Sequence, residues 1–316
     1  MPGSARGVVL VAAVGPRTNL DLVRRNLQKF EPSRWDCVLL AWHAVDVTER
    51  RCKVVVRAGW KWASLLNASR PLVARGDYAH ITIMLDDVDL DTLNLERTIC
   101  WSARSSGCSL GAGFDADELA ALVSSHRLGV ISPLVVNATN SVMRPMMASH
   151  GRINVERLKK RQRYGSLELV NAIETYLSVY SRAAWECHAS LFDDVILREG
   201  RQAVGWGYDR CYHPHCHHAT GGQALVTTMV VAHVGGWGGL SHRHGLAKQA
   251  RGQQRRLSAW VAAHDNASCV GAYRKLASFP DARRVNCTVK TCGAHTSAYA
   301  PPALRGRYAG GWALES

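Results

Sequence analysis

The sequence predicts an α/β protein with a mostly parallel central sheet flanked by helices. Over the first ninety residues, short apolar runs rich in β-branched residues alternate with segments of helical periodicity, a pattern typical of parallel strands joined by crossover helices. One apolar run, His80–Leu85, leads directly into acidic residues, as expected of a strand whose carboxyl end carries a ligand-binding turn. With 47% hydrophobic residues among 316, the chain can bury a sizeable core.

The N-terminal half provides the clearest elements. Val8–Val14 is a continuous apolar run that stops at Gly15-Pro16, so it suits a buried parallel strand followed by a loop. Helical spacing follows over residues 19–30. The next expected elements, in chain order, are strands at Cys37–Ala41 and Lys53–Val56, a helix at Trp60–Leu66 followed by a loop at Arg70-Pro71, and the strand His80–Leu85. The Ser- and Gly-rich residues 100–114 are interpreted as an inserted loop.

The C-terminal half begins with a helix at Asp115–Ser125, whose first turn is acidic. The elements expected after it are strands at Leu128–Val136, Ala172–Tyr180 and Leu225–Ala232, a helix at Ser181–Leu197 capped by Ser181, and a basic helix at Arg251–Ala263. Otherwise periodicity fades beyond Gly235. We therefore expect a compact domain over residues 1–240 and a basic, loop-rich C-terminal extension over residues 241–316.

The charge is strongly positive, at +14 with His neutral, which favours anionic partners such as nucleotide phosphates. No Asp or Glu occurs between Arg210 and His264, although a solvated basic face explains such a stretch equally well. The longest aliphatic run, Val8–Val14, is far shorter than the ~20 residues of a membrane span. We expect no transmembrane segment in this chain and no specific nucleic-acid partner, because no nucleic-acid-binding motif is present.

The ten cysteines include no CxxC pair, so a zinc-knuckle framework is not expected. Two pairs share a four-residue gap and are candidates for small disulfide loops: Cys211 with Cys216, and Cys287 with Cys292. Four N-x-[ST] sequons begin at Asn67, Asn137, Asn266 and Asn286. Together these features favour the lumen of the secretory pathway, the Golgi, if an anchor or signal precedes this chain, and the cytoplasm otherwise.

The sharpest motif is the acidic turn after His80–Leu85, with Asp86, Asp87 and Asp89 in sequence. Asp87 and Asp89 flank one residue, so a turn can direct both carboxylates at a single Mn²⁺ or Mg²⁺ ion, which in turn binds substrate phosphates. The alternative is an acidic turn that only caps a helix starting near Thr92. A calcium loop is excluded because the required Gly and Glu positions are both occupied by Thr.

Three further segments are candidates for ligand contact. In Trp60-Lys61-Trp62, aromatic faces can stack on a sugar or base and the Lys can pair with phosphate, although Trp residues also pack beneath helices. Trp206-Gly207-Tyr208-Asp209 offers a flexible loop with one potential general base, or a plain turn. The tract from His213 to His218 is either a partial zinc site, an adventitious metal-binding tract or, as we favour, an exposed loop.

The order of these motifs resembles the plant and algal family known as domain of unknown function 707, in the GT-A glycosyltransferase clan. Four segments between about Val8 and Gly236 carry the resemblance: Trp60-Lys61-Trp62-Ala63, the strand with Asp87-Val88-Asp89-Leu90, Glu174 with Val179–Trp185, and Trp206–Asp209 with Val231–Gly235. The family's middle acidic residue is Val88 here. The resemblance implies a GT-A-like fold and transfer of a sugar from a nucleotide-diphosphate donor to a glycan or small hydroxyl acceptor.

The resemblance also implies a role for each matching residue. Asp87, Asp89 and His233 would hold the divalent metal, and Asp209 would be the catalytic base of an inverting enzyme. The implied substrate-binding residues are Trp60, Lys61, Trp62, Asp86, Glu174, Arg182, Trp206 and Gly207.

Three other functions stay open at this point. The first is a catalytically inactive GT-A-like protein that binds a carbohydrate or nucleotide. The second is a phosphatase of the haloacid-dehalogenase type, because an acidic motif follows an apolar strand, although its downstream Lys and acidic pair are not found together. The third is non-specific nucleic-acid binding through the basic extension.

Overall fold

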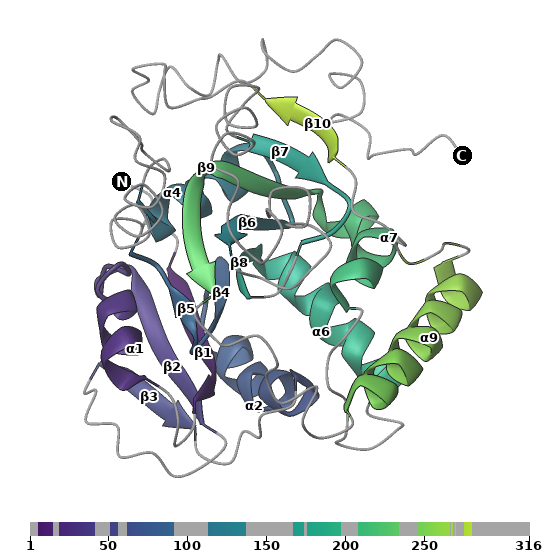
Figure 1. Ribbon diagram of the computed structural model, residues 1–316, viewed down its shortest axis with the longest axis horizontal. Helices are drawn as coiled ribbons and strands as arrows, with labels where there is room; N and C mark the ends of the chain where they lie inside the picture. The colour runs from purple at the N-terminus through teal and green to yellow at the C-terminus, as the bar shows by residue number, and fades with distance from the viewer. Residues whose placement is uncertain are drawn as a thin grey trace, which may run out of the picture.

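In the described part of the chain, ten strands form one sheet (Figure 1). The computed structural model describes residues 6–14, 19–41, 51–55, 62–91, 113–136, 167–173, 176–196, 208–233, 246–265, 267, 269 and 275–279. The strands are β1 (Gly7–Val14), β2 (Trp35–Ala41), β3 (Cys52–Val55), β4 (His80–Leu85), β5 (Val88–Asp89), β6 (Val130–Val136), β7 (Leu167–Val170), β8 (Leu177–Ser181), β9 (Gln223–His233) and β10 (Lys275–Phe279). They lie in the order β10-β7-β9-β6-β8-β4-β1-β2-β3, and β5 pairs with β9.

Most of these strands run in the same direction. β1 is parallel to β2 and β4, β2 is parallel to β3, and β6 is parallel to β9. β8 is antiparallel to both β4 and β6. It therefore lies between the parallel group that contains β4 and the parallel pair of β6 and β9, and both groups point the same way. β5 and β7 are antiparallel to β9, and β10 is antiparallel to β7. The predicted α/β class with a mostly parallel sheet is confirmed, and β5, β7 and β8 make the sheet mixed.

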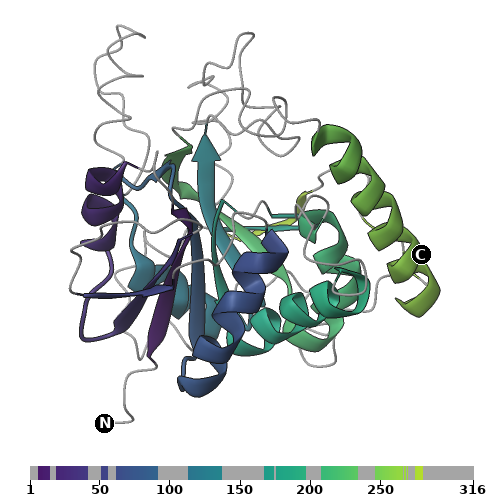
Figure 2. The same cartoon turned by 90° about the horizontal axis from the view of Figure 1, so that it is seen from below.

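Helices cover both faces of the sheet. They are α1 (Leu20–Leu27), α2 (Trp62–Arg75), α4 (Ala116–Ser125), α6 (Arg182–Ile196), α7 (Tyr208–Thr220) and α9 (Leu246–Asp265). α1 and α4 lie on one face and α2 and α6 on the other, while α7 packs on α6 and α9 packs on α7 (Figure 2). As predicted, the Ser181 hydroxyl accepts a hydrogen bond from the amide of Ala184 and caps α6. Within the described residues, every helix is too short or too polar to cross a membrane.

Several elements differ from the sequence-based prediction. α2 continues through Pro71, which is exposed, instead of ending before it. β7 lies in a stretch for which no element was predicted, because its four residues are all buried and too few to show a period. α7 replaces the loop that we favoured for the His-rich tract, and Pro214 interrupts the helical pattern there without ending the helix.

The described part of the C-terminal extension belongs to the same unit as the rest of the chain. α9 confirms the predicted basic helix and packs on α7, and β10 joins the sheet through β7. Within this extension, β10 is the described element that the sequence-based prediction lacked. A sequence without alternating apolar residues still forms a strand at β10, because β7 offers it an edge to pair with.

Disulfides connect neighbouring elements. Cys37–Cys52 joins β2 to β3, Cys187–Cys216 joins α6 to α7, and Cys211–Cys269 joins α7 to the segment after α9. The suggested Cys211–Cys216 loop is wrong. Five residues apart on a helix, these side chains point in directions about 140° apart, so each reaches a different partner. The other suggested pair, at residues 287 and 292, lies outside the described residues.

Candidate functional site

The predicted acidic turn lies at the carboxyl end of β4, in the middle of the sheet. The amide of Leu85 donates to the carbonyl of Tyr176 at 2.9 Å, and the amide of Asp86 donates to the carbonyl of Ala12 at 3.2 Å. The chain thus stays attached to segments on both sides as it leaves the sheet. Asp87 follows at the edge where ligands of open α/β sheets bind.

The last residue of β9 meets this turn. β5 pairs with the end of β9, with Val88 opposite His233 and Asp89 opposite Ala232. The arrowhead of β9 reaches β5 in the centre of the molecule (Figure 1). As a result, Nε2 of His233 lies 2.9 Å from Oδ2 of Asp87, a residue 146 positions away in sequence. The structure therefore brings together two of the three predicted metal ligands.

Two consecutive residues of α1 hold the turn from the other side. The amide nitrogen of the buried Asn26 side chain donates to the carbonyl of Val88 at 2.5 Å, and its oxygen accepts from the amide of Leu90 at 3.1 Å. Asn26 thereby satisfies backbone groups on both sides of Asp89. Nη2 of Arg25 lies 3.2 Å from Oδ2 of Asp89.

The pair of Asp87 and His233 fits a divalent cation. Oδ1 of Asp87 is buried with no hydrogen-bond partner, whereas buried polar atoms are normally satisfied, so this oxygen has lone pairs available to a cation. Neighbouring ligands of an octahedral ion with bonds of about 2.1 Å lie about 3 Å apart, close to the 2.9 Å between Oδ2 and Nε2. An imidazole nitrogen favours a transition ion, so the donor set suits Mn²⁺ better than Mg²⁺.

Asp89, the third predicted ligand, has other partners in this arrangement. Its Oδ2 pairs with Arg25, and its Oδ1 accepts from the amide of Asp91 at 2.9 Å. Among the described residues, three potential ligand atoms lie within 4.8 Å of one another only in a cysteine–histidine group on α6 and α7. Asp89 therefore does not complete a three-ligand group with Asp87 and His233 here. Its side chain is 13% exposed, and that of Arg25 is 44% exposed, so Arg25 faces solvent beside the turn.

Several predicted residues have no described side chain. Trp62 begins α2 and Asp209 lies in the first turn of α7, but both side chains fall outside the described part of the structure. The residues outside the described ranges altogether are Trp60, Lys61, Glu174, Trp206 and Gly207. Their assignment to substrate binding stays a prediction.

Arg182 lies away from the acidic turn, and its assignment to substrate binding stays a prediction. Its Nη1 donates to the carbonyl of Gly76 at 2.8 Å, and its Nε pairs with Glu186 at 2.8 Å. Its amide donates to the carbonyl of Ala79, just before β4 begins. The acidic turn follows the other end of this six-residue strand, about 20 Å away at ~3.3 Å per residue. Arg182 therefore connects α6 to the segment after α2.

Sequence reasoning missed Asn26 and Arg25. A weak signal for Asn26 was present, because it lies on the apolar side of its helix with Val23 and Leu27. Its partner could not be inferred, since the turn is 62 residues further along the chain.

No protein-family model matches the chain, and no curated protein matches it. Among solved structures, the crystal structure of GalNAc-T7 with UDP, GalNAc and Mn²⁺ is similar over 74% of this chain, with 13% identity and a TM-score of 0.44. This chain covers 44% of the GalNAc-T7 chain, less than half its length. The crystal structure of S. aureus TarS residues 1–349 in complex with UDP-GlcNAc is similar over 84% of this chain and 68% of that one, with 10% identity and a TM-score of 0.44.

Proposed function

We propose that the chain is a metal-dependent glycosyltransferase that moves a sugar from a nucleotide-diphosphate donor to a hydroxyl acceptor. The observation that carries this proposal is the contact between Asp87 and His233 at the carboxyl end of β4, with Oδ1 of Asp87 buried and unsatisfied. The order of sequence motifs that resembles the family of domain of unknown function 707 supports the same function and suggests membership of that family.

Asp87 and His233 are the residues that would hold the cation, preferably Mn²⁺. To act as a ligand, Nε2 of His233 must be deprotonated, so its ring proton would reside on Nδ1. When bound, a divalent cation neutralises charge on a diphosphate leaving group. Asp89 joins the ligand set only when its carboxylate leaves Arg25, whose exposed guanidinium is then available to pair with a phosphate.

Asp209 is the proposed base. An inverting displacement requires a carboxylate that removes the proton of the acceptor hydroxyl as the new glycosidic bond forms. Asp209 lies in the first turn of α7. Asp209→Asn should therefore abolish transfer while leaving donor binding unchanged.

The binding test uses UDP as the probe, with and without Mn²⁺, followed by calorimetry. We expect the affinity for UDP to rise with Mn²⁺ in the wild-type protein and this increase to disappear in Asp87→Asn and His233→Ala. Asp21→Asn and His264→Ala, at exposed positions, serve as matched controls. Equal UDP affinity with and without Mn²⁺ in the wild-type protein would contradict metal dependence.

A second candidate is a protein of the same architecture that binds a nucleotide or carbohydrate without catalysis. The ion pair between Asp89 and Arg25 favours it, because this pair occupies a carboxylate that a complete metal site would use. Turnover separates the two candidates. Release of UDP from a panel of UDP-sugars supports the transferase, whereas binding without any release supports the inactive protein.

For localisation we propose the secretory-pathway lumen. Disulfides form and persist in oxidising compartments, and six of the described cysteines are paired in three bridges. Non-reducing mass spectrometry of the protein from its native source tests this proposal, because free thiols at all six positions would contradict it.

A further inference from the structure

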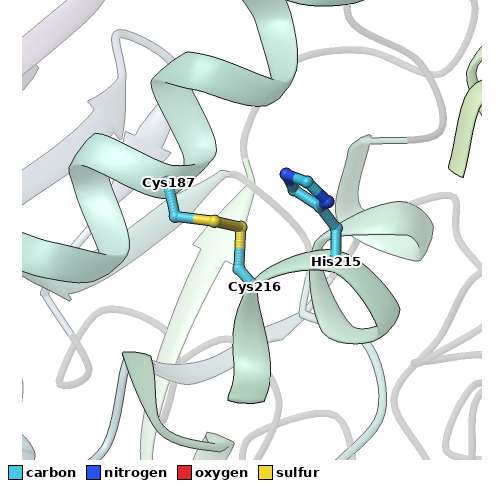
Figure 3. A group of neighbouring side chains, drawn as sticks. All are labelled: Cys187, His215 and Cys216. Carbon is cyan, nitrogen blue, oxygen red and sulfur yellow. A yellow bond between two sulfur atoms is a disulfide. The ribbon is translucent and has the colours of Figure 1, made fainter. Parts of the chain in front are cut away.

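A second group of potential metal ligands lies where α6 and α7 pack together. Cys187 on α6 is disulfide-bonded to Cys216 on α7, and the imidazole of His215 lies beside the two sulfur atoms (Figure 3). One ligand atom from each of these three residues lies within 4.8 Å of the other two. Cys216 is fully buried, and the Cys187 and His215 side chains are partly buried, so the group is sheltered but reachable by a small ion.

The orientation of His215 is fixed by α9. Nδ1 of His215 lies 2.7 Å from Oδ2 of Asp265, the last residue of α9, and the ring of Trp260 packs edge-on against it at 5.2 Å between centroids. With a carboxylate on Nδ1, the proton of the neutral ring resides there and Nε2 keeps its lone pair. The ring nitrogen farther from Cβ is the one on the disulfide side (Figure 3). A carboxylate that orients a histidine in this way is the usual outer partner of a zinc ligand.

We propose that Cys187, Cys216 and His215 form a zinc site when the disulfide is reduced, and that the disulfide and the zinc ion are alternative cross-links between α6 and α7. Two thiolates and one imidazole are ligands that select Zn²⁺, and a water molecule completes the tetrahedron. Asp265 is a positioning residue in this site. The site is separate from the acidic turn and does not depend on the proposed transferase activity.

Conversion of the disulfide into the zinc site is balanced in atoms and electrons. Two equivalents of a small thiol reduce the S–S bond by two electrons and become one small-molecule disulfide, leaving Cys187 and Cys216 as thiols. Binding of Zn²⁺ then displaces both thiol protons to solvent. In a tetrahedral site with Zn–S bonds of about 2.3 Å, the sulfur atoms lie about 3.8 Å apart, so they must separate from the ~2.05 Å of any disulfide bond. This change of under 2 Å is within the range of side-chain rotation.

The test titrates Co²⁺, a spectroscopic substitute for Zn²⁺, into the full chain reduced with a phosphine. We expect one Co²⁺ per chain, with a thiolate-to-cobalt charge-transfer band and the visible bands of a tetrahedral ion, and displacement of both by Zn²⁺. The oxidised chain should show neither. Cys187→Ser/Cys216→Ser should abolish the band, and His215→Ala and Asp265→Asn should each weaken binding about tenfold or more.

Control variants separate this group from the other cysteines that the structure describes. Cys37→Ser/Cys52→Ser and Cys211→Ser/Cys269→Ser should retain the charge-transfer band, and His264→Ala, next to Asp265 but exposed, should bind Co²⁺ like the wild type. A band that persists without Cys187 and Cys216 overturns the proposal, as does a reduced wild-type chain that binds no Co²⁺. Circular dichroism covers the remaining case: if the reduced chain loses its helical signal and Zn²⁺ does not restore it, the proposal is also wrong.

Discussion

Asn26→Leu tests how the acidic turn is held. Asn26 is 1% exposed and makes two hydrogen bonds to backbone groups of Val88 and Leu90, which are themselves fully buried. Leu has a similar volume but no polar atoms, so the variant leaves one carbonyl and one amide unsatisfied. Each such group costs about 1–3 kcal/mol, and burial of the leucine methyl groups offsets about 1 kcal/mol. We expect the free energy of unfolding to fall by about 1–5 kcal/mol, with a central value near 3 kcal/mol.

Urea denaturation of the oxidised protein measures this loss. With a slope of about 2–3 kcal/mol per M, the midpoint should fall by about 1 M. Native-state hydrogen exchange adds a local measurement, because the amide of Leu90 loses its acceptor and should exchange faster relative to the amide of Leu10 in β1. The control is Arg24→Ala, at a side chain 41% exposed in a surface ion pair, which should cost under about 0.5 kcal/mol. A midpoint within 0.2 M of wild type (about 0.5 kcal/mol), with Leu90 exchange unchanged, would refute the reasoning.

Three further predictions address charge, pH and cross-linking. Arg25→Gln removes a cation from Asp89, so Mn²⁺ affinity measured by electron paramagnetic resonance should rise several-fold; equal or weaker binding contradicts this account. Burial lowers the pKa of His188 to about 3, so the unfolded chain takes up a proton near pH 6.5 that the folded chain does not. The free energy of unfolding should therefore fall by about 2 kcal/mol between pH 7 and pH 5 on account of this residue, and His188→Leu should show a shallower pH dependence by that amount in denaturant titrations; identical slopes would argue against it. Cys37→Ala/Cys52→Ala opens a bridge between residues 15 apart and should cost about 3 kcal/mol in thermal unfolding without reductant, and a loss below about 1 kcal/mol would count against the bridge.

Much of the fold was predictable because its strands are short apolar runs with clear ends. The described side chains of Val8–Val14 are all buried, and so are those of His80–Leu85 except Leu85. A central strand of a covered sheet is the local structure that buries such short runs completely. The cap of α6 was predicted as well, since a Ser hydroxyl such as that of Ser181 satisfies a first amide of a helix. β7 and α7 were missed because four buried residues show no period, and because proline is a poor guide where tertiary contacts hold the helix.

The sequence by itself determined that acidic residues follow a central strand, because an apolar run ending in Asp86 and Asp87 has only one natural position at the sheet edge. It did not determine what those acids contact. Pairing of β5 with β9 places His233 against Asp87. Asp89 forms an ion pair with Arg25 of α1, and it does not join Asp87 and His233. Such contacts join residues tens to more than a hundred positions apart, and the free energy that selects them comes from burial across the whole core, which no local pattern records.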